Sequence, residues 1–335
     1  MIELRNYNAV GSMNLDNSYS LASLGDINMN PSMTLLDFIS VWLTVFKQNT
    51  IRASSYDRLI TSKNALENYS IASMPIGSIT FFDVQKYINE LVEAGYSMSG
   101  IKKQVRIVTA PLKQAAALRI IPSDPSIGIR MPIHENIKKP ARNVCAYTKE
   151  EQANLTEIIQ RKNKNAYLCD EFMIETGVRV GEALALRWRD VDLQRRRFTV
   201  RATVVNLANK RTSYVQECPK SYFSNRTIPL TQRALEILAL LKGRAKTEWV
   251  FENGKDRLSY ESLRYQTGKL CAEAAVDYHG EHVFRHTFAT NCYYKGVDIK
   301  ILSKLLGHAD VNITYSTYIN LYGDGFDAMY NALVK

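Results

Sequence analysis

The last quarter of the chain reads His282-Val283-Phe284-Arg285-His286, then Leu306-Gly307-His308, and then Tyr318. A second group with the same character, residues 176–182 (TGVRVGE), lies upstream, and Pro219-Lys220 stands between the two. These segments combine arginine, lysine, histidine and tyrosine. Such side chains can together bind a phosphodiester and attack it without a metal ion.

Each of these residue types can serve phosphoryl transfer at DNA. The attacked phosphate gains charge in the transition state, and the planar guanidinium of arginine can bind two of its oxygens. A lysine or histidine can donate a proton to the leaving 5′ oxygen. A tyrosine can attack the phosphorus and hold it as a covalent ester. The residue types therefore indicate a site that can bind and attack a phosphodiester.

The bulk composition agrees with a DNA-binding protein of two domains. A length of 335 residues favours two domains, and the net charge of +10 favours a polyanionic partner, although a merely basic protein remains an alternative. The five cysteines are odd in number and form no C-x-x-C pair, which argues against a disulfide framework and a zinc module. We find no signal peptide and no long apolar run, so we expect a cytoplasmic protein without membrane spans, metal or cofactor.

The N-terminal part is predicted to be all-helical. Residues 1–32 show no sustained period and are expected to be a flexible lead. From Thr34 the apolar residues recur at steps of three and four, which predicts a helix, and similar patterns follow. The expected helices cover residues 34–46, 55–68, 82–94 and 98–119, within a domain at 33–130.

Basic residues continue from the last of these helices into a proline-rich linker, expected at 131–146. A basic amphipathic helix can lie on DNA, although a solvated helix face gives the same pattern. The candidate DNA contacts are Lys102, Lys103, Arg106, Lys113, Lys138 and Lys139.

The remainder, residues 147–335, is predicted to mix helices with a few strands. Thr148 and Glu151 form a capping-box pattern that opens a helix. Further patterns predict helices, a turn and short strands rich in Val, Thr and Phe, followed by helices after residue 231. The helices are expected at 149–162, 165–176 and 180–187, the turn at 190–192, and the strands at 197–205, 214–218 and 226–229.

Four motifs in this order resemble the tyrosine recombinase, or phage integrase, family. They are residues 176–182, 219–230 (PKSYFSNRTIPL), 282–290 (HVFRHTFAT) and 306–318 (LGHADVNITYSTY). The resemblance implies an all-α N-terminal core-binding (SAM-like) domain. It also implies a mainly α catalytic domain with a small antiparallel β-sheet.

The resemblance assigns a role to each matching position. Tyr318 would be the nucleophile, and Arg179 with Arg285 would clamp the phosphate. Lys220 would be the general acid, although Lys210 could also reach DNA. His282 and His308 would handle the phosphate and protons. Glu182 and His286 would hold the other groups in place. An ordinary core position is the favoured alternative for His286.

The choice of tyrosine depends on spacing. Tyr315 and Tyr318 share roughly one helix face, so geometry does not separate them. Tyr318 lies ten residues after His308, a spacing found in integrases of conjugative transposons and prophages, and we therefore favour it. Asn320 departs from the family, which often has histidine there.

The family implies a site-specific recombinase, and we expect the integrase of a prophage or another mobile element. It would act as a tetramer on double-stranded attachment sites and be a monomer when free. A host bending protein or an excisionase could assist, and an amphipathic tail at 321–335 could dock on a neighbouring protomer. The alternatives are an Xer-type resolvase of chromosome dimers, a catalytically inactive DNA-binding regulator, and a type IB topoisomerase.

Overall fold

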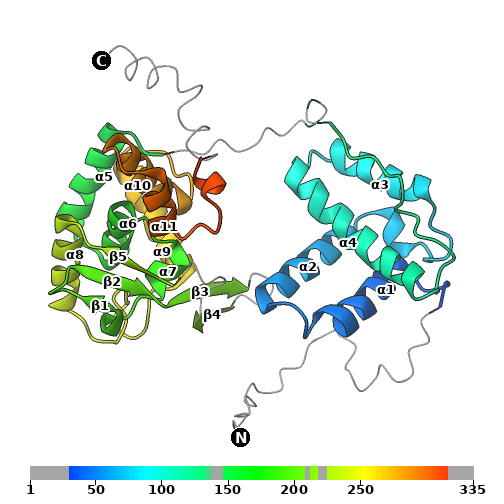
Figure 1. The fold of residues 1–335 in the computed structure, drawn as a ribbon, viewed down its shortest axis with the longest axis horizontal. Helices are drawn as coiled ribbons and strands as arrows, with labels where there is room; N and C mark the ends of the chain where they lie inside the picture. Colours follow the sequence, from blue (N-terminus) through cyan, green and yellow to red (C-terminus); the bar gives the residue numbers. More distant parts are fainter. Residues whose placement is uncertain are drawn as a thin grey trace, which may run out of the picture. The chain divides into compact units, whose positions relative to one another are not determined.

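The first unit of the chain is built from helices whose apolar faces meet in one core (Figure 1). The computed structural model describes residues 30–133, 135, 137, 146–207, 212–217 and 225–315. Contacts divide the chain into Met1–Ala141 and Arg142–Lys335. The first unit contains α1 (Leu35–Trp42), the π-helical η2 (Leu43–Lys47), α2 (Ala53–Leu66), the 3₁₀ turn η3 (Ser70–Ser73), α3 (Phe81–Glu93) and α4 (Met98–Ala117).

Local sequence sets where these helices begin. Thr34 caps α1 by accepting a hydrogen bond from the backbone N–H of Asp37, and Thr80 forms a capping box with Asp83 at the start of α3. Buried residues then recur at helical spacing along α1, α3 and α4. The core so formed includes Leu35, Phe38, Ile39, Val84, Tyr87, Ile88, Leu91, Ile101, Val108 and Leu112.

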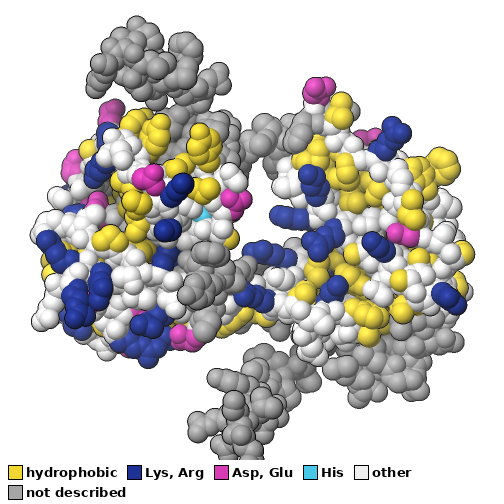
Figure 2. All heavy atoms as spheres, in the orientation of Figure 1, with side chains coloured by type: hydrophobic (Ala, Val, Ile, Leu, Met, Phe, Trp, Pro, Cys, Tyr) yellow, Lys and Arg dark blue, Asp and Glu magenta, His cyan; other side chains and the backbone are white. Residues whose placement is uncertain are grey.

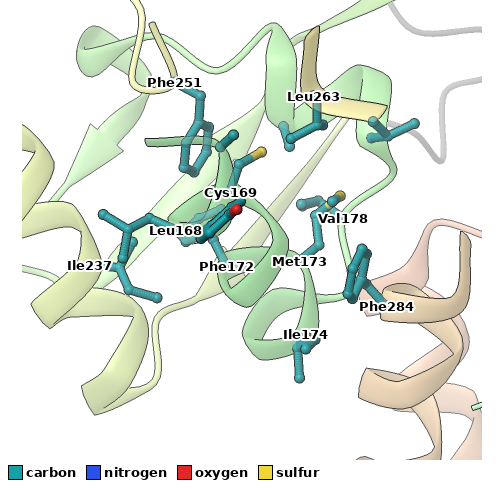
Figure 3. Packing of buried hydrophobic residues seen from close by; sticks show 14 of the residues in the cluster. Leu168, Cys169, Phe172, Met173, Ile174, Val178, Ile237, Phe251, Leu263 and Phe284 are labelled. Carbon is teal, nitrogen blue, oxygen red and sulfur yellow. The ribbon is translucent and has the colours of Figure 1, made fainter. Parts of the chain in front are cut away.

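The second unit is organised around α6 (Asn165–Thr176), a helix that is buried on nearly every side. Figure 3 shows its apolar residues, from Leu168 to Ile174, packed among Ile237, Phe251, Leu263 and Phe284. The surrounding helices are α5 (Lys149–Lys162), α7 (Val180–Leu184), α8 (Gln232–Lys242), α9 (Tyr260–Glu273), α10 (His282–Tyr294) and α11 (Ile299–Leu306). Residues 311–315 are also helical.

The strands of the second unit form two small antiparallel sheets. One has the order β1 (Val191–Asp192), β2 (Arg197–Val200), β5 (Arg226–Pro229), and Phe198 pairs with Ile228. The other pairs β3 (Ala202–Leu207) with β4 (Thr212–Glu217). The prediction of a helical domain and a mainly α domain with small antiparallel sheets is confirmed.

Three local predictions need correction. The single strand expected at 197–205 is two strands that separate at Arg201, because β2 pairs with β5 whereas β3 pairs with β4. The helix expected at 180–187 ends at Leu184, because the following backbone bonds to residues 248–250 instead. The turn expected at 190–192 contains the short strand β1. Pairing with distant segments decides the first two, whereas β1 pairs with the neighbouring β2.

Among the described residues, no helix is both long and apolar enough to cross a membrane.

Candidate active site

Two glycines place Arg179 between α6 and α7. Gly177 ends α6 with φ +66°, and a Cβ atom there would lie 2.3 Å from the Phe288 ring. Gly181 lies in α7 against β3, where a Cβ atom would come within 2.6 Å of Thr203 Oγ1 and of the Val204 carbonyl oxygen. Both positions therefore need glycine, and the sharp connection between the helices fixes the backbone of Arg179.

Arg285 reaches the same place from α10. The helix begins at His282, so Arg285 and His286 lie in its first two turns. The Arg285 side chain is buried, and its Nη1 donates to the Gly177 carbonyl oxygen at 2.7 Å. Its Nη2 donates to the carbonyl oxygen of Leu306. The HVFRH and TGVRVGE motifs are thus joined directly by a side chain of one and the backbone of the other.

Three arginines bind three successive carbonyl groups at the end of α11. Arg226 donates to the Leu305 oxygen, Arg285 to the Leu306 oxygen, and Arg179 to the Gly307 oxygen at 3.2 Å. The last carbonyls of a helix lack partners within the helix and carry its negative dipole end, so guanidinium groups bind well there. Gly307 then turns the chain with φ +67°. The LGH motif therefore supplies backbone acceptors as well as His308.

Glu182 is the carboxylate in the middle of this arginine cluster. Arg226 binds it with two parallel hydrogen bonds of 3.0 and 2.8 Å, and Arg179 Nη1 donates to it at 2.9 Å. The carboxylate also accepts from the backbone N–H of Arg179 at 2.9 Å. Burial acts to raise the pKa of Glu182, but Arg226 and then Arg179 lower it to about 2. Glu182 is therefore ionised and holds both arginines.

The arginine cluster has more positive than negative charge. In the described residues, Arg179 and Arg226 bind Glu182, and Arg285 is close enough to interact with it electrostatically. Burial together with Arg179 lowers the pKa of Arg285. A guanidinium stays protonated even so, because its intrinsic pKa is very high. Buried charge of one sign is costly unless an opposite charge approaches. The cluster is therefore suited to an anion such as a phosphate.

Three histidines lie near the arginines, and burial and the charge of the arginines lower their pKa values. His308 Nδ1 is 2.7 Å from Thr314 Oγ1, and the His282 and His286 rings are 6.4 Å apart between centroids. Burial, followed by the charge of Arg285 and Arg179, lowers the pKa of His308 to about 4 and also lowers that of His282. Burial and His282 lower the pKa of His286 to about 4. Neutral imidazoles of this kind can both donate and accept hydrogen bonds.

The structure brings together six of the eight predicted active-site and supporting residues: Arg179, Glu182, His282, Arg285, His286 and His308. Lys220 and Tyr318 lie outside the described residues, as do Lys138 and Lys139. Tyr315 is described, lies in the helical segment 311–315 and has an exposed side chain. Lys102, Lys103, Arg106 and Lys113 are exposed on α4. Within the described ranges, no three His, Cys, Asp or Glu side chains are placed to hold a metal ion.

Sequence reasoning missed Arg226, which contacts both Glu182 and the end of α11. A signal was present, because β5 alternates buried and exposed residues and Arg226 occupies an inward position with Ile228. An arginine on the buried face of a strand needs a buried partner. The pattern alone gives no indication that this partner is Glu182.

Comparison with known proteins identifies the family of this chain. The model of the phage integrase family matches residues 147–323. The tyrosine recombinase XerC-like protein of Caldanaerobacter subterraneus subsp. tengcongensis is 23% identical over 313 residues, which cover 86% of this chain and 80% of that protein.

Solved structures of integrases share the fold. The integrase of transposon Tn1549, in complex with transposon right end DNA, has a TM-score of 0.75 at 18% identity and covers 90% of this chain and 100% of that one. The lambda integrase tetramer bound to a Holliday junction has a TM-score of 0.63 at 16% identity, with 85% and 77% covered. The motifs, the family match and the fold define a tyrosine recombinase. The chain belongs to the phage integrase family.

Proposed function

We propose that this chain is a site-specific DNA recombinase that integrates and excises a prophage or another mobile element. The convergence of Arg179, Arg285 and His308 on the end of α11 carries the proposal. These groups come from three distant motifs, and the two arginines form a cationic site beside His308 and His282, which are neutral. Such a site matches the charge and shape of a DNA phosphate.

The two arginines retain donors for a phosphate after their protein contacts are made. A guanidinium has five N–H groups. The described hydrogen bonds hold two groups of Arg179, to Glu182 and Gly307, and two of Arg285, to Gly177 and Leu306. The protein bonds fix each plane, so the remaining groups are pre-oriented. Pre-orientation lowers the cost of stabilising charge that develops on the phosphate.

The histidines are suited to proton transfer once the phosphate is bound. His282 and His308 are neutral in the free protein because burial and the arginines lower the pKa of each. A phosphate beside them adds negative charge, which raises the pKa of an imidazole. A histidine with a pKa brought closer to neutrality can accept the tyrosine proton during attack.

The remaining roles fall to Lys220 and Tyr318. The Tyr318 oxygen would attack the phosphorus, the bond from phosphorus to the 5′ oxygen would break, and Lys220 would give that oxygen a proton. The product is a 3′-phosphotyrosyl ester and a free 5′ hydroxyl. Attack by the 5′ hydroxyl of a partner duplex would reverse the chemistry, so the bond energy is retained and no ATP is consumed.

The proposal extends to the assembly. The lambda integrase structure is a tetramer on a Holliday junction, and the Tn1549 integrase structure holds transposon end DNA. By analogy, four copies of this chain would exchange strands on paired attachment sites in the cytoplasm, aided by a bending protein or an excisionase. The helical domain at 33–130 and the catalytic domain at 147–335 would both bind DNA, and the tail at 321–335 would dock on a neighbour.

A recombination assay tests the function. Two duplexes carrying the sequences that flank the gene for this chain are mixed with protein in the presence of a chelator. We expect recombinant joints without added metal or ATP. Relaxation of supercoiled DNA without joints would indicate a topoisomerase, and binding with neither product would indicate a regulator.

An Xer-type resolvase is the second candidate, because XerC-like relatives match most of the chain. A resolvase would join two copies of a chromosomal site that lies apart from its own gene. Joints formed only by such a site, and not by the flanking DNA, would favour it over the mobile-element integrase.

A further inference from the structure

Arg226 contacts two parts of the proposed phosphate site, Glu182 and the end of α11. Its Nη1 and Nη2 bind the Glu182 carboxylate, and its Nε donates to the Leu305 carbonyl oxygen. We propose that Arg226 is a positioning residue for strand cleavage, which sets Arg179 through Glu182 and sets His308 through the end of α11. This inference rests on the recombinase function proposed above.

The first connection runs through charge. Glu182 is buried, with 5% of its surface exposed, and shares its charge between Arg226 and Arg179. Without Arg226, Arg179 would be the nearest remaining countercharge for a buried carboxylate, which attracts it more strongly when it stands alone. A guanidinium drawn onto Glu182 would bind a phosphate less well. Arg226 therefore keeps Arg179 available by neutralising its neighbour.

The second connection runs through the backbone. The Leu305 oxygen bound by Arg226 directly precedes the two oxygens that bind Arg285 and Arg179, and His308 follows them. A shift of this helix end would move all three acceptors and the histidine together. The hydrogen bond from Arg226 therefore fixes one end of a segment that both phosphate arginines use.

Arg226 acts through these groups and not on DNA itself. Its side chain is 7% exposed, and all three of its donating nitrogens point to protein oxygens. Arg179, by contrast, keeps a third of its side chain exposed. A direct phosphate contact is therefore assigned to Arg179 and a supporting contact to Arg226.

Arg233 offers a matched control. It also binds a buried carboxylate through two parallel hydrogen bonds, of 2.9 and 2.8 Å to Glu171, but this pair joins α8 to α6 and contacts none of the site residues named above. Replacing either arginine by methionine removes a guanidinium and keeps most of the volume. The two variants therefore separate loss of a buried ion pair from loss of site geometry.

The experiment compares Arg226→Met, Arg226→Lys, Glu182→Gln, the double variant Arg226→Met/Glu182→Gln, and Arg233→Met. Single-turnover adduct formation is measured at saturating nicked DNA, together with DNA affinity and thermal unfolding. For Arg226→Met we expect adduct formation to slow roughly ten- to a hundredfold, the range typical of groups that support a reacting group, with DNA affinity nearly unchanged. Arg226→Lys should lie between it and wild type.

The double variant tests the charge argument. Glu182→Gln removes the carboxylate that would otherwise hold Arg179, and the glutamine oxygen can still accept from the Arg179 backbone. The double variant should therefore cleave faster than Arg226→Met alone. It also removes the unpaired buried charge, so it remains informative if Arg226→Met does not fold.

The outcomes are distinguishable. Adduct formation by wild type, with Arg226→Met no slower than Arg233→Met, would overturn the role of Arg226 and leave the recombinase function intact. A double variant no faster than Arg226→Met would overturn the charge connection to Arg179. If wild type formed no adduct, the recombinase function and this inference would fall together.

Discussion

The arginine cluster at the end of α11 and the basic face of α4 both concentrate positive charge, but they are built differently. Arg226 and Arg285 are buried and bonded to Glu182 or to backbone carbonyls. Lys102, Lys103 and Arg106 stand exposed on α4, and Figure 2 shows dark blue side chains over the region where Figure 1 labels that helix.

The difference indicates a division of labour. Exposed charges interact with DNA through a field that salt screens, so they add affinity without fixing one geometry. Buried and bonded guanidinium groups cannot adjust freely, so they hold a geometry that suits one reacting phosphate. We therefore expect changes in the arginine cluster to affect cleavage and changes on α4 to affect binding.

Among the described residues, the largest effect is expected for Arg179→Ala. The exposed part of this guanidinium would contact the reacting phosphate, so its loss should slow adduct formation by about 10²- to 10³-fold, as for removal of one donor to a developing oxyanion. DNA affinity should change only a few-fold, because many other contacts remain. Single-turnover cleavage and a binding titration measure the two. A large loss of DNA affinity with unchanged cleavage would show that Arg179 serves binding and not cleavage.

Gly177→Ala tests the connection between α6 and α7 that positions Arg179. The added Cβ atom meets the Phe288 ring, and φ is +66°, so we expect a loss of roughly 2–4 kcal/mol in the free energy of unfolding. Gly268→Ala in α9 is the control, since a Cβ atom there meets nothing within 4 Å. That change should be neutral or mildly stabilising in denaturant titration. Equal stability of the two variants would mean that Gly177 does not constrain the fold.

The burial of His308, together with the charge of the arginine cluster, predicts a pH dependence of stability. The pKa of His308 is about 4 in the folded chain, below its ordinary 6.5, so the unfolded state binds more protons between these values. The contribution of His308 to stability is therefore complete above about pH 6.5 and is lost as the pH falls toward 4. Wild type should lose a few degrees more in Tm between pH 7 and 5 than His308→Asn does.

The same comparison removes other titrating groups from the result. Burial raises the pKa of Asp170, which opposes the histidine trend, but Asp170 is present in both proteins and its effect cancels. Identical slopes of Tm against pH in wild type and His308→Asn would contradict the lowered pKa of His308 in the folded chain.

The smallest effects are expected on α4. Arg106→Ala and Lys113→Ala should each weaken DNA binding a few-fold and lower the salt dependence by about one released counterion, with cleavage at saturating DNA unchanged. Lys86→Ala on α3 is the control, because that lysine pairs with Glu90. Binding titrations at several salt concentrations measure the slopes. A changed cleavage rate at saturation would show that α4 does more than bind.

The parts of the site that sequence could predict are those encoded locally. Gly177 and Gly307 end helices, and the motifs that contain them resemble those of the tyrosine recombinase family, so the resemblance predicted Arg179, Arg285 and His308 as a group. The α6 core was predictable from its length and apolar content.

The rest depends on long-range pairing. Arg226 binds a carboxylate from another motif, and β2 separates from β3 because their partners differ. Neither pattern is visible in a short window of sequence. The three carbonyls at the end of α11 could not be predicted either, because backbone acceptors leave no residue signature. Lys220 remains a prediction from the family resemblance, and Tyr318 remains one from the resemblance and its spacing from His308.

Covalent capture of DNA by the nucleophile is the most direct test of the proposed cleavage by Tyr318. Wild type, Tyr318→Phe and Tyr315→Phe are incubated with a nicked duplex of flanking DNA in the presence of a chelator, and SDS-resistant protein–DNA adducts are measured. We expect an adduct with wild type and with Tyr315→Phe, and none with Tyr318→Phe. An adduct that persists in Tyr318→Phe and disappears in Tyr315→Phe would contradict this expectation.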